Sequence, residues 1–217
     1  MLRTGEVVER YKVDTLVGEG GMAKVYLVRH RQLNSLHVLK VLNISGKTIQ
    51  QRLVQEGRIQ ASLHHPNIVS VTDVLMVGGA PALLMPFVDG PPLENWIREL
   101  HPVPIPAVEK IFQGILAGLR EAHSYDLVHR DLKPSNVLLS KTVDGWIPMI
   151  SDFGIAKAMS RSGGESSYTH SGLPMGTPSY MAPEQINDAK DVDQRADIFA
   201  MGCILYELLI TMQSLRD

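Results

Sequence analysis

The spacing of apolar residues changes once along this chain, near residues 86–92, and that change limits the folds open to it. Before it, apolar and polar residues alternate in short runs at 11–17, 24–30, 36–42, 70–76 and 82–87, which predicts strands, while 47–63 has the spacing of a helix. After it, apolar residues recur at helical spacing, most clearly between Val108 and Leu119. The sequence therefore predicts a β-rich N-terminal part and a helix-rich C-terminal part.

Composition narrows the class of protein. The chain has 217 residues, a net charge of −2 and a single cysteine, Cys203. The charge gives no reason to expect a nucleic-acid or membrane-surface partner. One cysteine excludes a disulfide framework and favours a reducing, cytoplasmic compartment. No apolar signal core opens the sequence, and the C-terminal apolar run is shorter than the ~20 residues of a membrane span.

That C-terminal run is unusual because it is apolar on almost every side. Between residues 198 and 212 only Gly202, Glu207 and Thr211 are not apolar. This pattern predicts a helix enclosed on nearly all sides, with Cys203 as a buried structural thiol.

A glycine-rich segment, GEGGMAKVY at residues 18–26, suggests phosphate binding in three ways. A P-loop would need glycine at Ala23 and a hydroxyl at Val25. The dinucleotide fingerprint fits Gly18, Gly20 and Ala23, but it must open a helix and be followed by an acidic residue about 20 positions on. Here a strand is predicted, and no acid occurs between Glu19 and Glu56. A glycine flap between two antiparallel strands, or a plain hairpin turn, fits better.

Lys40 lies within an apolar strand, and Glu56 lies on the mostly apolar face of the helix that follows. A buried charge is unfavourable unless it is paired. The two side chains are natural partners, although a surface lysine and a frayed helix would also fit the pattern.

Three later motifs agree in order and spacing: LVHRDLKPSNVLLS at 127–140, ISDFGIAK at 150–157 and GTPSYMAPE at 176–184. With these the chain resembles the protein kinase superfamily over about residues 11–212, and most closely the eukaryotic-like Ser/Thr kinases of bacteria. The resemblance implies an α+β, two-lobed kinase-like fold with ATP between the lobes. The β-rich N-lobe would cover about 11–88, and the helical C-lobe about 89–217 without its last helices.

The resemblance also implies the chemistry, which is transfer of the ATP γ-phosphate to Ser/Thr hydroxyls of protein substrates. Asp131 would accept the hydroxyl proton, and Lys133 would neutralise charge on the γ-phosphate. Asn136 and Asp152 would hold Mg²⁺. Lys40, fixed by Glu56, would hold the α- and β-phosphates.

The ATP contacts implied by the resemblance come from the glycine segment, the strands after it, the hinge and the pocket floor. They are Val17, Gly18, Glu19, Gly20, Gly21, Met22, Ala23, Lys24, Val25, Val38, Lys40, Glu56, Met85, Pro86, Val88, Leu138 and Asp152. Three positions depart from the family pattern: Ala23 replaces a glycine, Val38 an alanine and Pro86 a glutamate. None of the three removes a catalytic group.

Regulation is implied less directly. Arg130 resembles the arginine that captures a phosphate on the activation loop, and the polar segment 160–172 offers several hydroxyls. We expect autophosphorylation with Thr169 as the leading site, and the resemblance allows self-association for transfer in trans.

In the family, Asp197 steadies the catalytic-loop backbone, and later helices enclose the helix that begins there. A later arginine pairs with the glutamate at the position of Glu184, and Arg216 is too close in sequence to be that partner. We therefore expect either a fragment of a longer kinase or a short form whose partner covers Ile204, Leu208 and their neighbours. A truncated, non-catalytic nucleotide-binding or scaffold module is the alternative function.

Overall fold

The computed structural model of the chain describes residues 1–20, 23–43, 47–100, 102–153, 178–187 and 192–210, without the side chains of 47–50, 52, 53, 56, 178 and 187. Contacts divide the chain into two compact units. Unit 1 comprises Met1–His64 and Val69–Phe87, and unit 2 comprises His65–Ile68 and Val88–Asp217.

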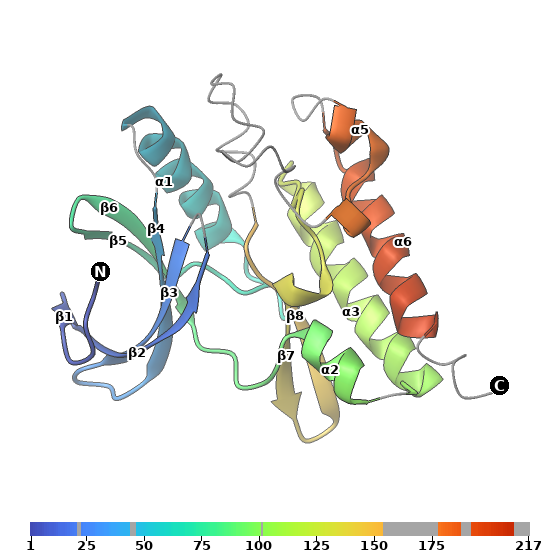
Figure 1. Cartoon of the computed structure of the whole chain (residues 1–217), viewed down its shortest axis with the longest axis horizontal. Helices are drawn as coiled ribbons and strands as arrows, with labels where there is room; N and C mark the ends of the chain where they lie inside the picture. The colour runs from blue at the N-terminus through green and yellow to red at the C-terminus, as the bar shows by residue number, and fades with distance from the viewer. Residues whose placement is uncertain (21–22, 44–46, 101, 154–177, 188–191, 211–217) are drawn as a thin grey trace. The chain divides into compact units, whose positions relative to one another are not determined.

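Unit 1 is an antiparallel sheet with one helix. The sheet has the order β1-β2-β3-β4-β6-β5, in which neighbouring strands pair antiparallel (Figure 1). Its elements are β1 (Val7–Val8), β2 (Tyr11–Glu19), β3 (Ala23–His30), β4 (Leu36–Leu42), α1 (Lys47–Ser62), β5 (Asp73–Val77) and β6 (Ala80–Pro86).

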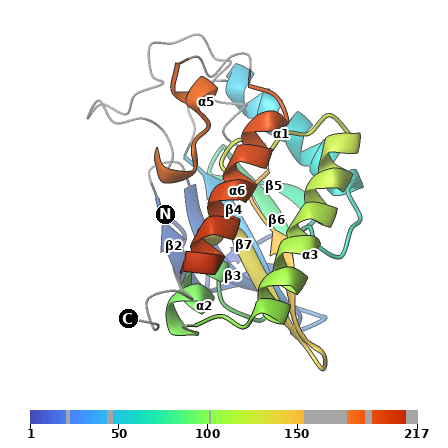
Figure 2. The same cartoon turned by 90° about the vertical axis from the view of Figure 1, so that its right-hand side faces the viewer.

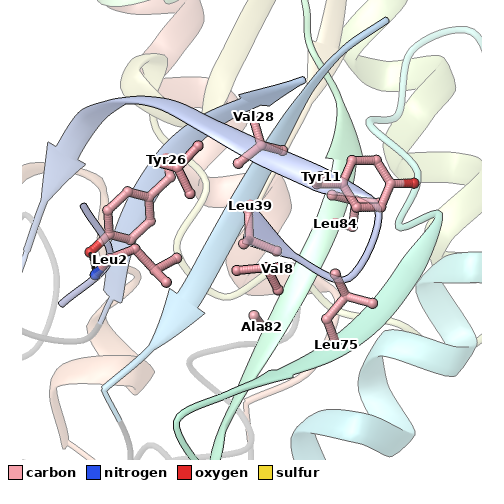
Figure 3. Close-up of a cluster of buried hydrophobic side chains, with 10 residues drawn as sticks. Leu2, Val8, Tyr11, Tyr26, Val28, Leu39, Leu75, Ala82 and Leu84 are labelled. Atoms are coloured by element: carbon pink, nitrogen blue, oxygen red, sulfur yellow. Dashed lines mark hydrogen bonds between the residues drawn. The ribbon is translucent and has the colours of Figure 1, made fainter. Parts of the chain in front are cut away.

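One face of this sheet carries the core of unit 1. Tyr26, Leu39 and Leu84, from three neighbouring strands, are almost completely buried in it (Figure 3). Because side chains alternate between the two faces of a strand, the residues next to these point to the opposite face. Helix α1 packs on that opposite face, where a Cβ added to Gly57 would lie 3.2 Å from Leu83.

The strands and the helix predicted from the spacing of apolar residues are present, with differences of a few residues at their ends. The last two predicted strands were misplaced: β5 begins at Asp73 rather than residue 70, and β6 begins at Ala80 rather than residue 82. The hydroxyl of Ser70 donates to the Leu63 carbonyl, so the chain there is still leaving α1 and has not yet joined the sheet.

Unit 2 is mostly helical. Its elements are α2 (Leu93–Glu99), α3 (Ile105–Ser124), the short 3₁₀ helix η1 (Pro134–Asn136), the hairpin β7 (Val137–Thr142) and β8 (Gly145–Ile150), the 3₁₀ helix η2 (Pro178–Tyr180), α5 (Pro183–Asn187) and α6 (Arg195–Ile210). Helix α3 lies against β8, and the backbone comes close where α3 has glycine. An added Cβ at Gly114 would lie 2.5 Å from Pro148, and one at Gly118 would lie 2.8 Å from the Asn67 carbonyl.

The expectation that α6 lacks the elements that enclose it in the family agrees with the structure. Ile198, Phe199 and Tyr206 are exposed on it, and in Figure 2 α6 faces the viewer with no described element in front of it. The prediction that Ile204 and Leu208 are the residues in need of a cover is wrong, because both are 0% exposed. Hydrophobicity on every side of a helix does not reveal which side is packed.

The open side of α6 borders a groove of about 620 Å³ next to η2, lined by Ser179, Tyr180, Ile198, Phe199, Gly202, Cys203, Tyr206 and Glu207. Cys203 is half-buried rather than buried, and this burial raises the pKa of its thiol. Glu207, the one acid in the apolar run, accepts a hydrogen bond of 2.5 Å from the Tyr180 hydroxyl. Of the helices that the structure describes, none combines the length and the apolar character needed to cross a membrane.

Candidate active site

The loop between α3 and β7 carries the predicted catalytic residues, and His129 organises it. The His129 ring is completely buried. Its Nδ1 accepts from the Asp131 N–H (3.2 Å) and its Nε2 contacts the Ser151 carbonyl (2.8 Å), so the proton must lie on Nε2. The ring also packs on Phe153, with centroids 4.8 Å apart. His129 thus connects the segment of Asp131 to the segment of Asp152.

The three predicted catalytic side chains come together within this loop. Lys133 Nζ lies 3.0 Å and 3.3 Å from the two carboxylate oxygens of Asp131. The Asn136 amide nitrogen donates to the Asp131 backbone carbonyl (2.7 Å) and to its carboxylate (3.3 Å). The Asp131 side chain keeps 35% of its surface exposed. A proton acceptor is therefore held in place and stays accessible.

Asp197, at the start of α6, holds the backbone of this loop through its carboxylate. Its carboxylate accepts the backbone N–H of His129 (2.8 Å) and of Arg130 (2.9 Å), and it lies 2.8 Å from His123 Nε2. The side chain is 1% exposed. The role expected for Asp197 from the resemblance, holding the catalytic-loop backbone, matches these bonds.

Two residues at this site have left-handed backbone conformations, Arg130 (φ 67°) and Asp152 (φ 66°). Such a conformation disfavours residues other than glycine by about 1–3 kcal/mol and persists only where the surroundings impose it. Each lies next to a residue that a backbone hydrogen bond holds in place. The Asp131 N–H donates to His129 Nδ1, and the Ser151 N–H donates to the Asn136 carbonyl (2.9 Å). Two of the five described non-glycine residues with positive φ therefore lie at the predicted site, and Glu9, Asn34 and Asp126 are the other three.

Asn67 fixes the strand that leads to Asp152. Its side-chain amide donates to the Pro148 carbonyl (2.7 Å), and its own carbonyl accepts from the Ile150 N–H (2.8 Å). The segment His65–Ile68 is thereby attached to β8, two residues before Asp152.

In unit 1, four predicted ATP contacts share one face of the sheet. Val25 pairs with Lys40, and Val38 pairs with Met85. Their strand neighbours Tyr26, Leu39 and Leu84 are in the core, so Val25, Val38, Lys40 and Met85 lie on the opposite face.

That same face carries α1, which packs there through Gly57. Leu83, the residue that Gly57 approaches, pairs directly with Lys40. The side chain of Glu56 lies outside the described residues, so its pairing with Lys40 stays a prediction.

The glycine segment forms a hairpin between β2 and β3, in which Gly18 pairs with Val25 and Glu19 pairs with Lys24. The Glu19 carboxylate lies 2.8 Å from Lys24 Nζ, and this hydrogen bond raises the pKa of Lys24. A strand follows the glycines, as predicted, which rules out both motifs that must open a helix. Gly21 and Met22 lie outside the described residues.

Four further predicted ATP contacts lie at or near the ends of strands. Pro86 is exposed at the end of β6, where it pairs with His37. Val88 is buried, and Leu138 is half-buried in β7, opposite Met149. Val17 is exposed near the end of β2. Their contacts with a nucleotide stay predictions.

The donor set suits Mg²⁺, which prefers oxygen ligands. The Asn136 amide nitrogen is bound to Asp131, and no described residue donates to the Asn136 amide oxygen. Asp152 follows β8 and supplies a carboxylate. Within the described ranges, His, Cys, Asp and Glu do not gather in groups of three or more that could hold a metal ion. A Mg²⁺ site at Asn136 and Asp152 stays a prediction.

Comparison with known proteins decides the family. The model of the protein kinase domain matches residues 11–216. The chain belongs to the protein kinase family. This kinase chain is 35% identical over 209 residues to the serine/threonine-protein kinase pkn3 of Myxococcus xanthus, covering 94% of this chain and 38% of that protein. It is 40% identical over 199 residues to Pkn1 of the same organism, covering 89% and 28%.

A solved structure agrees. The crystal structure of Rad53 1-466 in complex with AMP-PNP superposes with a TM-score of 0.74 at 26% identity, over 92% of this kinase chain and 48% of the Rad53 chain. The predicted α+β kinase fold, β-rich in the N-lobe and helical in the C-lobe, is confirmed. The kinase chain spans about a third of the length of the curated relatives it matches.

Several residues that build the site were not singled out from the sequence. His123, His129 and Gln185 each make hydrogen bonds to the catalytic loop or to Asp197. Of these three, only His129 could have been identified from the sequence, since it lies within the motif at 127–140. The predicted activation-loop segment 160–172, with Thr169, and Arg216 lie outside the described residues.

Proposed function

We propose that this chain is a serine/threonine protein kinase that transfers the γ-phosphate of ATP to hydroxyl groups of protein substrates. The observation that carries the proposal is the accessible Asp131 carboxylate, held between Lys133 and Asn136 on a backbone fixed by Asp197. Phosphoryl transfer asks a protein mainly for such positioning and charge neutralisation.

In this proposal Asp131 accepts the proton of the attacking hydroxyl. Lys133, already 3.0 Å from that carboxylate, neutralises charge that develops on the transferred phosphoryl group. The names of the relatives, which are serine/threonine kinases, support a hydroxyamino-acid substrate over tyrosine.

We assign Mg²⁺ to the Asn136 amide oxygen and the Asp152 carboxylate. When bound, Mg²⁺ would neutralise the phosphate oxygens of ATP and hold them in line for transfer. Asp152 is kept in position by the bonds from Ser151 to the Asn136 carbonyl (2.9 Å from N–H, 3.1 Å from the hydroxyl).

In the N-lobe we assign the α- and β-phosphates to Lys40 and the backbone of the glycine hairpin. The adenine ring is assigned to Val25, Val38 and Met85, which share the sheet face of Lys40, with hinge contacts from Pro86 and Val88. The AMP-PNP complex of the similar Rad53 structure supports nucleotide binding.

We further propose a cytoplasmic signalling role, with autophosphorylation of Thr169 in trans through self-association. Arg130 would receive the phosphate. Its Nη2 already donates to the Val192 carbonyl (2.8 Å), and the guanidinium has further N–H donors for a phosphate.

The test uses thermal unfolding and phosphate transfer together. We expect ATP with Mg²⁺ to raise the melting temperature and to label a generic basic protein. Loss of a general base typically lowers the rate about 10²–10⁴-fold, so Asp131→Asn should keep the thermal shift and lose most of the labelling. Stabilisation without transfer would instead favour the non-catalytic nucleotide-binding module, and equal labelling by both proteins would refute the mechanism.

A further inference from the structure

Gln185, on the short helix α5, uses both ends of its side-chain amide. Its Oε1 accepts from the Ala182 N–H (3.0 Å), and its Nε2 donates to the backbone carbonyl of Arg130 (2.7 Å). Ala182 directly precedes α5, so the first bond is half of a capping box, in which a glutamine at the third helical position satisfies a free N–H at the helix start. The second bond has no role in capping.

The two bonds fix how the amide is oriented. An N–H group needs an acceptor, and a carbonyl needs a donor. Reversing the amide would place Nε2 against the Ala182 N–H and Oε1 against the Arg130 carbonyl, which makes both contacts repulsive. The side-chain Nε2 of Gln185 is therefore the donor, and the backbone carbonyl of Arg130 is its acceptor.

The Arg130 carbonyl belongs to the peptide bond that links Arg130 to Asp131. Arg130 has a left-handed backbone (φ 67°), a conformation that surrounding contacts must impose on an arginine. Asp197 holds the Arg130 N–H at 2.9 Å on one side. Gln185 holds the carbonyl on the other side, 55 residues away in sequence.

We propose that Gln185 is a positioning residue for phosphoryl transfer: its bond to the Arg130 carbonyl holds the left-handed turn that presents Asp131. This inference rests on the proposed kinase function. The bond from Gln185 directly connects α5 to the catalytic loop.

Gln185→Glu separates positioning from capping. The ionised carboxylate can still accept from Ala182, but it presents an acceptor to the Arg130 carbonyl. A protonated carboxylic acid regains a donor and fits both partners. Gln185→Met removes both bonds at any pH. Gln194→Met is the matched control, because Gln194 Nε2 also donates to a backbone carbonyl, that of His123 (3.2 Å), outside the catalytic loop.

The experiment measures the rate of phosphate transfer from ATP and the KM for ATP, for the full chain and the three variants, between about pH 8 and about pH 5.5. Near pH 8 we expect Gln185→Glu to be about 10-fold slower, with KM for ATP little changed. Relative to wild type at each pH, it should recover about threefold or more on acidification, as its carboxyl group protonates. Gln185→Met should stay slow throughout, and Gln194→Met should match wild type.

The ratio to wild type removes the pH effects that both proteins share. The titratable and charged residues that line the same small cavity as Gln185 are Arg130, Asp131, Tyr180 and Asp197, and all four are unchanged in the variants. A Gln185→Glu rate equal to wild type near pH 8 overturns the inference. A slow rate whose ratio stays flat with pH overturns it too.

Amide hydrogen exchange gives a readout that does not need activity. Loss of the Gln185 donor should speed exchange in the peptide covering residues 127–133 by about threefold or more, because bonds that hold a backbone segment set its local opening. Gln194→Met should leave that peptide unchanged. If wild type transfers no phosphate, the proposed function fails, and exchange alone decides: unchanged exchange in Gln185→Glu and Gln185→Met refutes the role of Gln185.

Discussion

Replacing Asp197 by asparagine tests how the catalytic loop is held. The Asp197 carboxylate has two oxygens: Oδ1 accepts from the Arg130 N–H, and Oδ2 accepts from the His129 N–H and contacts His123 Nε2. Asparagine has nearly the same shape but only one oxygen. Whichever way its amide lies, one backbone N–H of the loop faces an NH₂ group and loses its acceptor.

The magnitude follows from burial and charge. The Asp197 side chain is 1% exposed, so solvent cannot replace the missing acceptor. A hydrogen bond to a charged group contributes about 1.5–3 kcal/mol, and an unsatisfied buried donor costs about as much again in the worst case. We therefore expect the free energy of unfolding to fall by about 3 kcal/mol, which lowers the melting temperature of a chain of this size by about 6–12 °C.

The assay is thermal unfolding followed by circular dichroism, with phosphate transfer measured on the same samples well below the melting temperature. The matched control is Asp193→Asn, because Asp193 is exposed and its side chain contacts Arg195; its melting temperature should be close to that of wild type. If Asp197→Asn melted with wild type and transferred phosphate at the same rate, the idea that this carboxylate holds the loop would be wrong.

Three other substitutions give sharp expectations. Gly118→Ala should lower the free energy of unfolding by about 1–3 kcal/mol, because the added methyl group overpacks against Asn67. Gly202→Ala should raise the free energy of unfolding by about 0.5–1 kcal/mol, because the site of Gly202 has space for a methyl group. Urea unfolding of both variants measures these changes, and equal effects would contradict the packing described for α3. Burial, and then the bond to Glu207, raise the pKa of Tyr180 above its ordinary value near 10.0, so its contribution to stability is complete below that pH and is lost as the pH rises through the raised pKa. Tyr180→Phe should therefore lose less stability than wild type between about pH 9 and about pH 11, and parallel losses in urea titrations would argue against it.

Local patterns were enough to predict the N-lobe elements apart from β1, which no pattern indicated. Alternation of apolar residues identified β2, β3 and β4 because each strand has one face in the core and one outside it. The same reasoning located the glycine hairpin and excluded the motifs that open helices. It placed the start of β5 three residues too early, at Ser70, whose hydroxyl donates to the carbonyl of Leu63 just after α1.

The predicted catalytic residues lie close together in sequence, within one loop that the family resemblance identifies. The bonds that hold this loop could not be derived from spacing, because they join residues far apart. Gln185 reaches Arg130 across 55 positions, and His123 meets Asp197 across 74. Asp197 itself was expected only through the family resemblance.

Helix α6 shows a different limit. Its sequence is apolar all round, so no stripe indicates which side faces the rest of the C-lobe. Packing buries Ile204 and Leu208 and leaves Phe199 and Tyr206 exposed, the reverse of what was expected for the first two. Only the position of the neighbouring elements decides this, and a single helix sequence does not carry that information.

The most direct test of the central claim is the identity of the amino acid that receives phosphate from γ-labelled ATP. The full chain, Asp131→Asn and Asp193→Asn would be compared on one protein substrate at equal concentrations with Mg²⁺. The account predicts label on serine and threonine, retained in Asp193→Asn and lowered about 10²–10⁴-fold in Asp131→Asn. Label on tyrosine, or equal labelling by Asp131→Asn, would contradict it.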